Sequence, residues 1–380
     1  MDLSILNIAY IIAGFFAFIF IVFLLTIKTK RSLPNYMLAA YLLLFSLDTL
    51  NQFFTYYLFP LSPIAGMLIS LSVYMMMPAL YLFVKSSIFR DFRLTPGSLF
   101  HLLPYILINI LLIPGYFLVH LRGNFTPEYA AEFSGSQALM LAYILVYVQI
   151  AIYAVLILSE LRNYRQLLIE NYSNPNMGNH RWLLQFIMLV LVLYFIGLVK
   201  NVLRFSSSEI IFNYAAIMVV IGILIFVSWV LLKSLKHPGV FTGIYSDMQL
   251  VQKMLKEPES SIKLSGESLQ LIKKIKDHMV EEEPYLDSSL SMQELAGQVN
   301  MKVKDLSLLI NHTLNQHFFD FVNQYRINKA SEILSNPENK QVTVLEVLYE
   351  VGFNSKSSFN TTFKKLTGQT PTQFRKSKLV

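Results

Sequence analysis

The chain has 380 residues, of which 54% are hydrophobic and only 14% are charged, and its mean hydropathy is +0.49. These values exceed ordinary soluble usage and indicate membrane-embedded segments. The formal net charge is +7, and the lack of cysteine excludes disulfides, thiol catalysis and cysteine-based metal sites.

Residues 1–235 contain nearly all of the long apolar runs and predict a bundle of seven transmembrane helices. Each run is long enough for the roughly 30 Å hydrocarbon core at about 1.5 Å per residue. The third run is the weakest because Pro78 splits it, although neighbouring helices can tolerate such a break. The expected spans are about 5–27, 36–59, 64–84, 99–120, 137–159, 182–203 and 210–232.

Basic residues gather in alternate loops between these spans. The opposite loops have only Arg122 and Arg204, whereas one side carries Lys28, Lys30, Arg31, Lys85, Arg90, Arg93, Arg162, Arg165, Arg181, Lys233 and Lys236. By the positive-inside rule the N-terminus lies outside and the C-terminus in the cytoplasm, and an odd number of crossings gives the same topology. We therefore expect a multi-pass protein of a bacterial-type inner membrane, in contact with the lipid bilayer.

Polar residues interrupt two of the predicted spans. Asp48, Asn51 and Gln52 recur at helical spacing in the second span, and Lys200 lies at the outer end of the sixth. An ionisable residue inside a bilayer is costly, so these residues are candidates for an outward-facing ligand pocket with Asp48 and Lys200 as opposed charges. Alternatively, Lys200 snorkels to the headgroups, and the Asp48 group joins helices through hydrogen bonds. We favour the structural interpretation for Lys200 and leave both open for Asp48.

Residues 236–287 are predicted to connect the membrane bundle to a C-terminal domain. An amphipathic helix is expected from about 266 to 282, with one apolar side formed by Leu269, Ile272, Ile275 and Met279. We expect this side to pack on the C-terminal domain. A short dimerising helix is the alternative, because spacings of three to four also suit a coiled-coil seam.

Residues 288–380 predict an all-α domain of two similar halves joined by a long helix at about 318–335. In the first half, Ser291 and Glu294 form a capping box, and Asn300 suits the left-handed turn that follows. The next helix, at about 303–312, is expected to bury Leu306, Leu309 and Ile310 and to expose Lys304, Asp305, Ser307, Leu308 and Asn311.

The second half repeats this pattern with clearer signals. Thr343 and Glu346 form a capping box, Gly352 supplies a positive φ, and Ser355 caps a second helix that Gly368 ends. A third helix opens with a further box at Thr370, Pro371 and Gln373. The second helix is expected to bury Phe359, Phe363 and Leu366 and to expose Lys356, Ser357, Asn360, Thr361, Lys364 and Lys365. Such a helix, tight turn and polar second helix is typical of a helix-turn-helix that reads the major groove.

Charge favours the same interpretation. Residues 351–380 contain six Lys or Arg residues and no Asp or Glu. A solvated helical surface is the alternative, since charge runs usually face water. A face of one sign nevertheless suits a phosphate backbone better than a neutral solubilising face.

Two runs, VGFNSKSSFNTTFKKLTGQTPTQFRK and, upstream, LSLLINHTLNQHFFDFVNQYRINKASEIL, resemble the arabinose-operon activator (AraC/XylS) family of transcription regulators. The resemblance covers about the last hundred residues and implies two helix-turn-helix units joined by a linker helix, with Arg326 in its Tyr-Arg-Ile motif. Both units could then meet successive major-groove faces about 34 Å apart. The chain departs from the family where Leu348 replaces a small Ala and Lys302 replaces a capping Ser.

Together these features predict a membrane-tethered, sequence-specific transcription regulator that couples an envelope or membrane signal to promoter DNA. The expected partners are double-stranded DNA, lipid, a second copy in a homodimer and a small-molecule or envelope signal. No enzyme motif, cofactor site or metal site is predicted, and a transporter or channel with a regulatory DNA-binding tail is the alternative. Base contacts are expected from Lys304, Ser307, Asn311, Lys356, Ser357, Asn360, Thr361 and Lys364, and backbone contacts from Lys365, Arg375 and Lys376.

Overall fold

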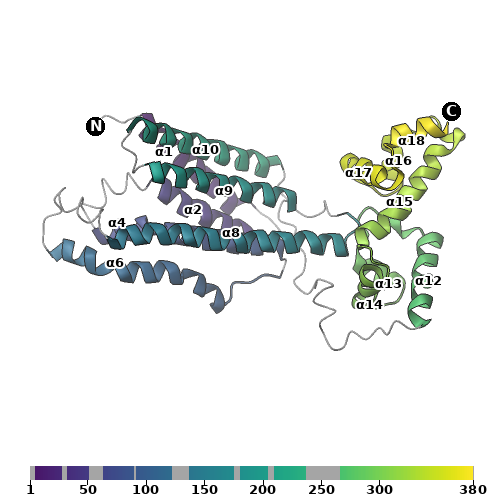
Figure 1. Cartoon of the computed structure of the whole chain (residues 1–380), viewed down its shortest axis with the longest axis horizontal. Helices are drawn as coiled ribbons and strands as arrows, with labels where there is room; N and C mark the ends of the chain where they lie inside the picture. Colours follow the sequence, from purple (N-terminus) through teal and green to yellow (C-terminus); the bar gives the residue numbers. More distant parts are fainter. Residues whose placement is uncertain are drawn as a thin grey trace. The chain divides into compact units, whose positions relative to one another are not determined.

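A computed structural model describes residues 5–27, 32–50, 63–89, 91–121, 137–174, 180–203, 209–236 and 266–379. Within these ranges the secondary structure is helical, so the all-α prediction is confirmed there. The chain forms two compact units (Figure 1). The first comprises Met1–Leu161 and Asn179–Ser246, and the second comprises Arg162–Gly178 and Asp247–Val380.

The first unit consists of apolar helices. Among the described residues, five segments are long and apolar enough to cross a membrane: Ile8–Thr26, Leu68–Ile88, Leu141–Asn171, His180–Leu203 and Tyr214–Lys233. The predicted second span overlaps α2, and its residues 51–59 lie outside the described part of the chain. The predicted fourth span overlaps α6. Neither α2 nor α6 is among the five, so the sevenfold bundle is not confirmed. The elements are α1 (Ile5–Thr26), α2 (Leu33–Thr49), α4 (Pro63–Ser70), α5 (Val73–Ile88), η1 (Pro96–Leu102), α6 (Leu103–Leu121), α8 (Gln137–Asn171), α9 (His180–Leu203) and α10 (Glu209–Lys236).

Aromatic side chains form the centre of this unit. Phe186 of α9 is fully buried, and its ring centroid lies 5.4 Å from those of Trp182 and Phe226 and 5.5 Å from that of Phe83. Tyr41 of α2 contacts the same ring edge-on. Since α5, α9 and α10 each contribute a ring, these contacts join helices that are far apart in the sequence.

Pro78 does not split the third span, contrary to the sequence prediction. It lies inside α5, and the break falls instead at Leu71–Ser72, between α4 and α5. Pro78 has no N–H to donate to the carbonyl of Tyr74, four residues earlier. Gln149 Nε2 of α8 donates to that carbonyl at 3.0 Å, which replaces the missing bond and lets the helix continue.

Replacing Gln149 with leucine should therefore destabilise the first unit by about 1 kcal/mol, because the Tyr74 carbonyl loses its donor. In a Pro78→Ala background the N–H of residue 78 is restored, so the same substitution should cost much less. The melting temperatures of the four intact proteins in detergent, followed by size-exclusion chromatography after heating, form the required cycle. Equal losses in both backgrounds would contradict this account.

The second unit holds two small hydrophobic cores on one shared helix, α15 (Figure 1). Phe318, Phe321 and Val322 of α15 belong to the first core, whereas Ile327 and Leu334 belong to the second. The elements are α12 (Gly266–Glu281), η3 (Pro284–Leu286), α13 (Met292–Gln298), α14 (Val303–Leu308), the π-helical turn η4 (Leu309–Thr313), α15 (Phe318–Ser335), η5 (Pro337–Asn339), α16 (Val344–Glu350), α17 (Lys356–Thr367) and α18 (Pro371–Lys378).

Helix α12 packs into the first core, as predicted. Ile272, Ile275 and Met279 are buried there, and Lys274 Nζ donates to the carbonyl of Val299 at the end of α13, at 2.7 Å. The prediction for Leu269 is wrong, because this side chain is 72% exposed. Its neighbour Ser268 is the buried residue in the first turn of α12.

The local signals in the sequence are confirmed in this unit. Capping boxes open α13, α16 and α18 at the predicted Ser291, Thr343 and Thr370. Gly352 and Gly368 have φ values of 85° and 79°, in the left-handed region. Asn300 also has a positive φ, 52°, and ends the turn after α13. The helix boundaries therefore follow from short-range hydrogen bonds and backbone conformations.

Candidate DNA-binding surface

Helices α16 and α17 form the second helix-turn-helix unit. The turn between them contains Gly352, and Ser355 caps α17 by accepting a hydrogen bond from the N–H of Ser358. Phe359 and Phe363 are buried in the second core, where their ring centroids lie 5.6 Å apart. Leu366, expected to be buried with them, is 39% exposed, because it lies in the last turn of α17 beyond the core.

The opposite face of α17 is polar and open. Lys356, Ser357, Thr361 and Lys364 are exposed, as the sequence pattern predicts, whereas Asn360, also expected to be exposed, is half-buried. A donor-rich face of positive charge can bond to phosphate oxygens and to base edges. Side-chain amides and hydroxyls suit base edges, whereas lysines suit the backbone.

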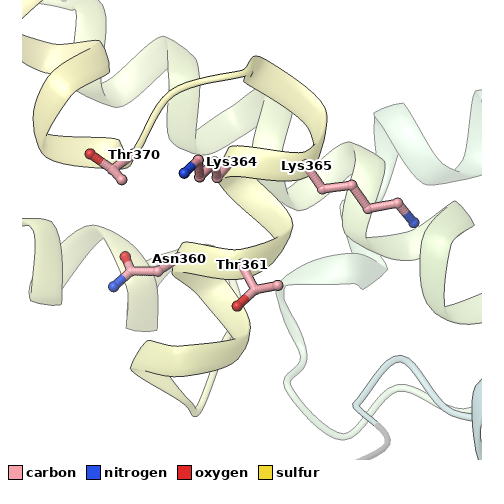
Figure 2. Close-up of a pocket in the computed structure, with 5 residues that line it drawn as sticks. All are labelled: Asn360, Thr361, Lys364, Lys365 and Thr370. Atoms are coloured by element: carbon pink, nitrogen blue, oxygen red, sulfur yellow. The ribbon is translucent and has the colours of Figure 1, made fainter.

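A hollow of about 460 Å³ lies on this face, lined by Asn360, Thr361, Lys364, Lys365 and Thr370 (Figure 2). Lys364 and Thr370 face one another across it, whereas Lys365 points away. Sequence reasoning treated Thr370 only as the cap of α18. Its place on this surface could have been inferred from its position, because it stands at a helix N-terminus that directly follows a basic helix.

Lys365 is engaged within the protein. Its Nζ lies 2.8 Å from Oδ1 of Asp320 on α15. An exposed pair of this kind contributes about 0–1 kcal/mol, so a phosphate can compete for the lysine. Its predicted contact with the DNA backbone stays a prediction.

The first helix-turn-helix unit, α13 and α14, offers fewer side chains. Ser307 is only 2% exposed, so the expectation that it faces outward is wrong, and the same holds for Leu308. Asn311 Nδ2 donates to Ser307 Oγ and to its carbonyl oxygen, both at 3.1 Å. Ser307 and Leu308 lie in α14 between the buried Leu306 and Leu309, and the π-helical turn η4 begins directly after them.

The remaining candidates of this surface differ in exposure. Lys304 and Asn311, on the first helix-turn-helix unit, are half-buried. Lys302 forms no side-chain cap on α14, as expected because a lysine side chain cannot accept a backbone N–H. On α18, Lys376 is exposed and Arg375 is half-buried. The Nε and Nη2 atoms of Arg375 are buried without a hydrogen-bond partner in the described part of the chain. The second helix-turn-helix unit therefore has more side chains available to contact DNA than the first.

The candidates in the first unit of the chain are only partly described. Asp48 lies on α2 and Lys200 on α9, close enough for their charges to interact. Asn201 Nδ2 donates to the hydroxyl of Tyr147 at 2.6 Å, which joins α9 to α8 next to Lys200. Asn51 and Gln52 lie outside the described residues.

Two helix-turn-helix units on one shared helix, one with an open basic face, define a tandem helix-turn-helix domain of the DNA-binding class. Residues 295–377 match a family model described as a helix-turn-helix domain. The C-terminus of this chain is an AraC-type helix-turn-helix domain, which confirms the family resemblance seen in the sequence.

Several transcription regulators are similar to this part of the chain. A regulator in the cgkA 5′ region of Pseudoalteromonas carrageenovora is 40% identical over 75 residues, which is 20% of this chain and 40% of that protein. The Msm operon regulatory protein of Streptococcus mutans is 27% identical over 89 residues, 23% of this chain and 31% of that protein. An HTH-type regulator of Staphylococcus aureus is 33% identical over 93 residues, 24% of this chain and 12% of that protein. The chain thus spans less than half the length of these relatives.

One solved structure is similar as well. The C-terminal domain of AraT, a response regulator from Geobacillus stearothermophilus, is 26% identical, and the match covers 31% of this chain and 90% of that domain, with a TM-score of 0.25.

Proposed function

We propose that this protein is a membrane-tethered transcription regulator that binds specific promoter sequences and couples a membrane or envelope signal to them. One observation carries the proposal: a DNA-binding domain of AraC type is joined in one chain to a unit in whose described residues five helices are apolar enough to cross a membrane. The protein is not expected to be an enzyme, and a homodimer on DNA belongs to the proposal.

The surface of the first unit supports membrane insertion. Large apolar side chains stand exposed along its helices, among them Phe15, Phe18, Val155, Phe195 and Ile225, each at least 59% exposed. A water-soluble protein rarely exposes so large an apolar area, whereas lipid tails cover it without cost. The alternation of basic loops supports a cytoplasmic C-terminal domain.

Different side chains of the second helix-turn-helix unit are proposed to contact bases and phosphates. Asn360 and Ser357 contact base edges, whereas Lys376 contacts phosphate. Lys304 and Asn311 of the first helix-turn-helix unit also contact DNA. Asp48 and Lys200 are the candidates for a signal-binding or coupling site in the membrane.

Asn360→Ala should reduce discrimination between selected and random duplexes by about tenfold, because an amide–base contact accounts for about 1–3 kcal/mol. Lys376→Ala should weaken binding to both kinds of duplex alike and reduce the salt slope by about one. Fluorescence anisotropy of the intact chain in nanodiscs, over a series of salt concentrations, measures both effects. Equal losses from the two substitutions on both duplexes would refute this division of labour.

The proposal as a whole is tested by mapping the genomic sites bound by the intact chain and comparing transcripts after deletion of its gene. We expect discrete sites upstream of genes whose transcript levels change. Binding without site preference and unchanged transcripts would instead fit a structural anchor for the chromosome. Solute flux in vesicles that lack DNA would favour a transporter with a regulatory tail.

A further inference from the structure

A short segment between two apolar helices is buried against the DNA-binding domain. Ser173 and Asn174, just after α8, are 1% and 5% exposed and belong to the same compact unit as the helix-turn-helix pair. A loop that merely connects two membrane helices would normally lie on the surface and bond to water. Its burial therefore calls for a structural or regulatory role.

Every polar group of Ser173 is bonded to that domain. Its N–H donates to the carbonyl of Leu290 at 3.1 Å. Its carbonyl accepts from Asn323 Nδ2 at 3.2 Å and from Arg326 Nη1 at 3.3 Å, and its Oγ accepts from Arg326 Nη2 at 3.1 Å. Such complete satisfaction indicates a formed docking site rather than a chance contact.

The docked segment bridges the two halves of the domain. Tyr172 forms an antiparallel bridge with Ser291, the cap of α13 in the first helix-turn-helix unit. Asn174 Nδ2 donates to Oδ1 of Asn354, which lies directly before Ser355, the cap of α17 in the second unit. The segment therefore contacts both units and the helix between them.

The docked residues continue directly from an apolar helix. Helix α8 runs without interruption for 35 residues to Asn171, about 50 Å at 1.5 Å per residue. That length exceeds the roughly 30 Å hydrocarbon core, so the end of α8 projects beyond it. Tyr172 is the next residue, so a shift or rotation of α8 moves the docked segment with it.

Docking leaves the DNA-facing side chains free. Lys356, Ser357 and Thr361 stay exposed while Asn174 contacts Asn354. The segment can therefore fix the spacing of the two helix-turn-helix units without covering their exposed side chains. A tandem helix-turn-helix domain needs the correct spacing of its two units, because their recognition helices must meet successive faces of the major groove.

Release is compatible with a folded domain. Without Ser173, Arg326 still donates to the carbonyls of Tyr285 and Asp287, both at 2.6 Å, and to Asn323 Oδ1 at 3.3 Å. The guanidinium therefore keeps three of its five bonds. Docking can be reversible because its loss does not leave this charge unpaired.

We propose that Tyr172–Asn174 is a clamp through which α8 controls DNA binding: when docked, it holds the two helix-turn-helix units at the spacing that a two-box site requires. This inference rests on the proposed function. It names the route by which a signal in the membrane reaches the DNA-binding surface. Movement of α8 withdraws the clamp and lowers affinity for a site with both boxes.

The test compares the wild-type chain in nanodiscs with the double variant Ser173→Val/Asn174→Leu. The probes are duplexes that the wild-type chain enriches from a random pool, each with both boxes or with one box mutated. We expect the variant to bind the two-box duplex about tenfold more weakly, since the second contact loses its preset geometry, and the one-box duplex within about twofold of wild type. Gln166→Ala is the matched control, because Gln166 bonds only within α8, to Glu170, and it should bind both duplexes like the wild type.

Unchanged or higher two-box affinity in the variant would overturn the clamp, and higher affinity would identify the segment as an inhibitory lid. A second measurement guards against misfolding. The chain has no cysteine, so Asn174→Cys with Asn354→Cys can be joined by a short bis-maleimide without background reaction. The cross-linked protein should keep its two-box affinity, and loss of binding on cross-linking would also overturn the clamp. If the wild-type chain enriches no sequence at all, the proposed function fails instead.

Discussion

Alanine at position 352 is expected to destabilise the C-terminal domain by about 4 kcal/mol and to abolish DNA binding. Gly352 has a φ of 85°, where a residue with a Cβ is strained. A Cβ there would also lie 2.6 Å from the carbonyl oxygens of Tyr285 and Leu286. Both effects act on the turn that precedes the recognition helix α17.

The neighbouring backbone cannot move aside cheaply. The carbonyl oxygen of Tyr285 accepts a 2.6 Å hydrogen bond from Arg326 Nε, and the Tyr285 side chain is buried in the first core. Relief of the clash would therefore displace either that bond or the whole turn. Since Tyr285 belongs to the first core and Gly352 to the turn of the second unit, the substitution separates the two halves.

Gly368→Ala provides the matched control. Its φ of 79° is nearly the same, but a Cβ would have no heavy atom within 4 Å, so only the conformational cost of about 1 kcal/mol remains. Hydrogen exchange of the amides in α16 and α17, measured on the intact chain, reports the free energy of opening. Equal losses at both glycines would show that the close approach of η3 is unimportant.

The sequence was sufficient for features set within a few residues. The capping boxes at Ser291, Thr343 and Thr370 and the turns at Asn300, Gly352 and Gly368 depend on neighbours three or four positions away. The apolar stripe of α16 and the polar face of α17 follow from helical spacing. The exposure of Lys356, Ser357, Thr361 and Lys364 on α17 was accordingly predicted correctly, whereas Asn360 is half-buried and Leu366 is exposed. Their contacts with DNA stay a prediction.

Features set by distant residues could not be predicted. Ser307 is buried although helical spacing placed it on the exposed face, and the π-helical turn that begins at Leu309 has no simple sequence signal. The pairing of Lys365 with Asp320 joins positions 45 residues apart, and the bonds of Arg326 to Ser173 join positions 153 apart. Periodicity and caps carry no information at such separations. The interruption of the third span was misplaced for the same reason, because Gln149 compensates Pro78 from another helix.

Replacing Arg326 with methionine should destabilise both halves of the domain, by about 4 kcal/mol. The side chain is 1% exposed, and its guanidinium lies 5.6 Å from the ring centroid of Phe353. Burial lowers the pKa of Arg326 to about 10, so the group remains charged at neutral pH. Methionine fills much of the space but leaves the carbonyl of the buried Tyr285 without a donor, at about 1–3 kcal/mol. It also removes one of the two donors of the Asp287 carbonyl, which keeps the N–H of Leu290 at 3.2 Å.

Two control substitutions separate the role of Arg326 from a general effect of α15. Arg326→Lys keeps the charge but not the planar fork of donors, so it should recover only part of the loss. Lys329 lies three residues from Arg326, and its ammonium forms a 2.8 Å ion pair with Glu283. Both side chains are about one-third exposed, so Lys329→Met should lower the stability of the domain by less than about 1 kcal/mol.

Hydrogen exchange of the intact chain should show amides of α13 and of α17 opening more readily in Arg326→Met, since η3, the docked Ser173 and α15 all converge on this guanidinium. Loss confined to α16–α18 would mean that Arg326 supports only the second core. In that case the clamp at Tyr172–Asn174 would have no connection through Arg326 to the first helix-turn-helix unit, and its contacts with Leu290 and Ser291 would have to link the two units.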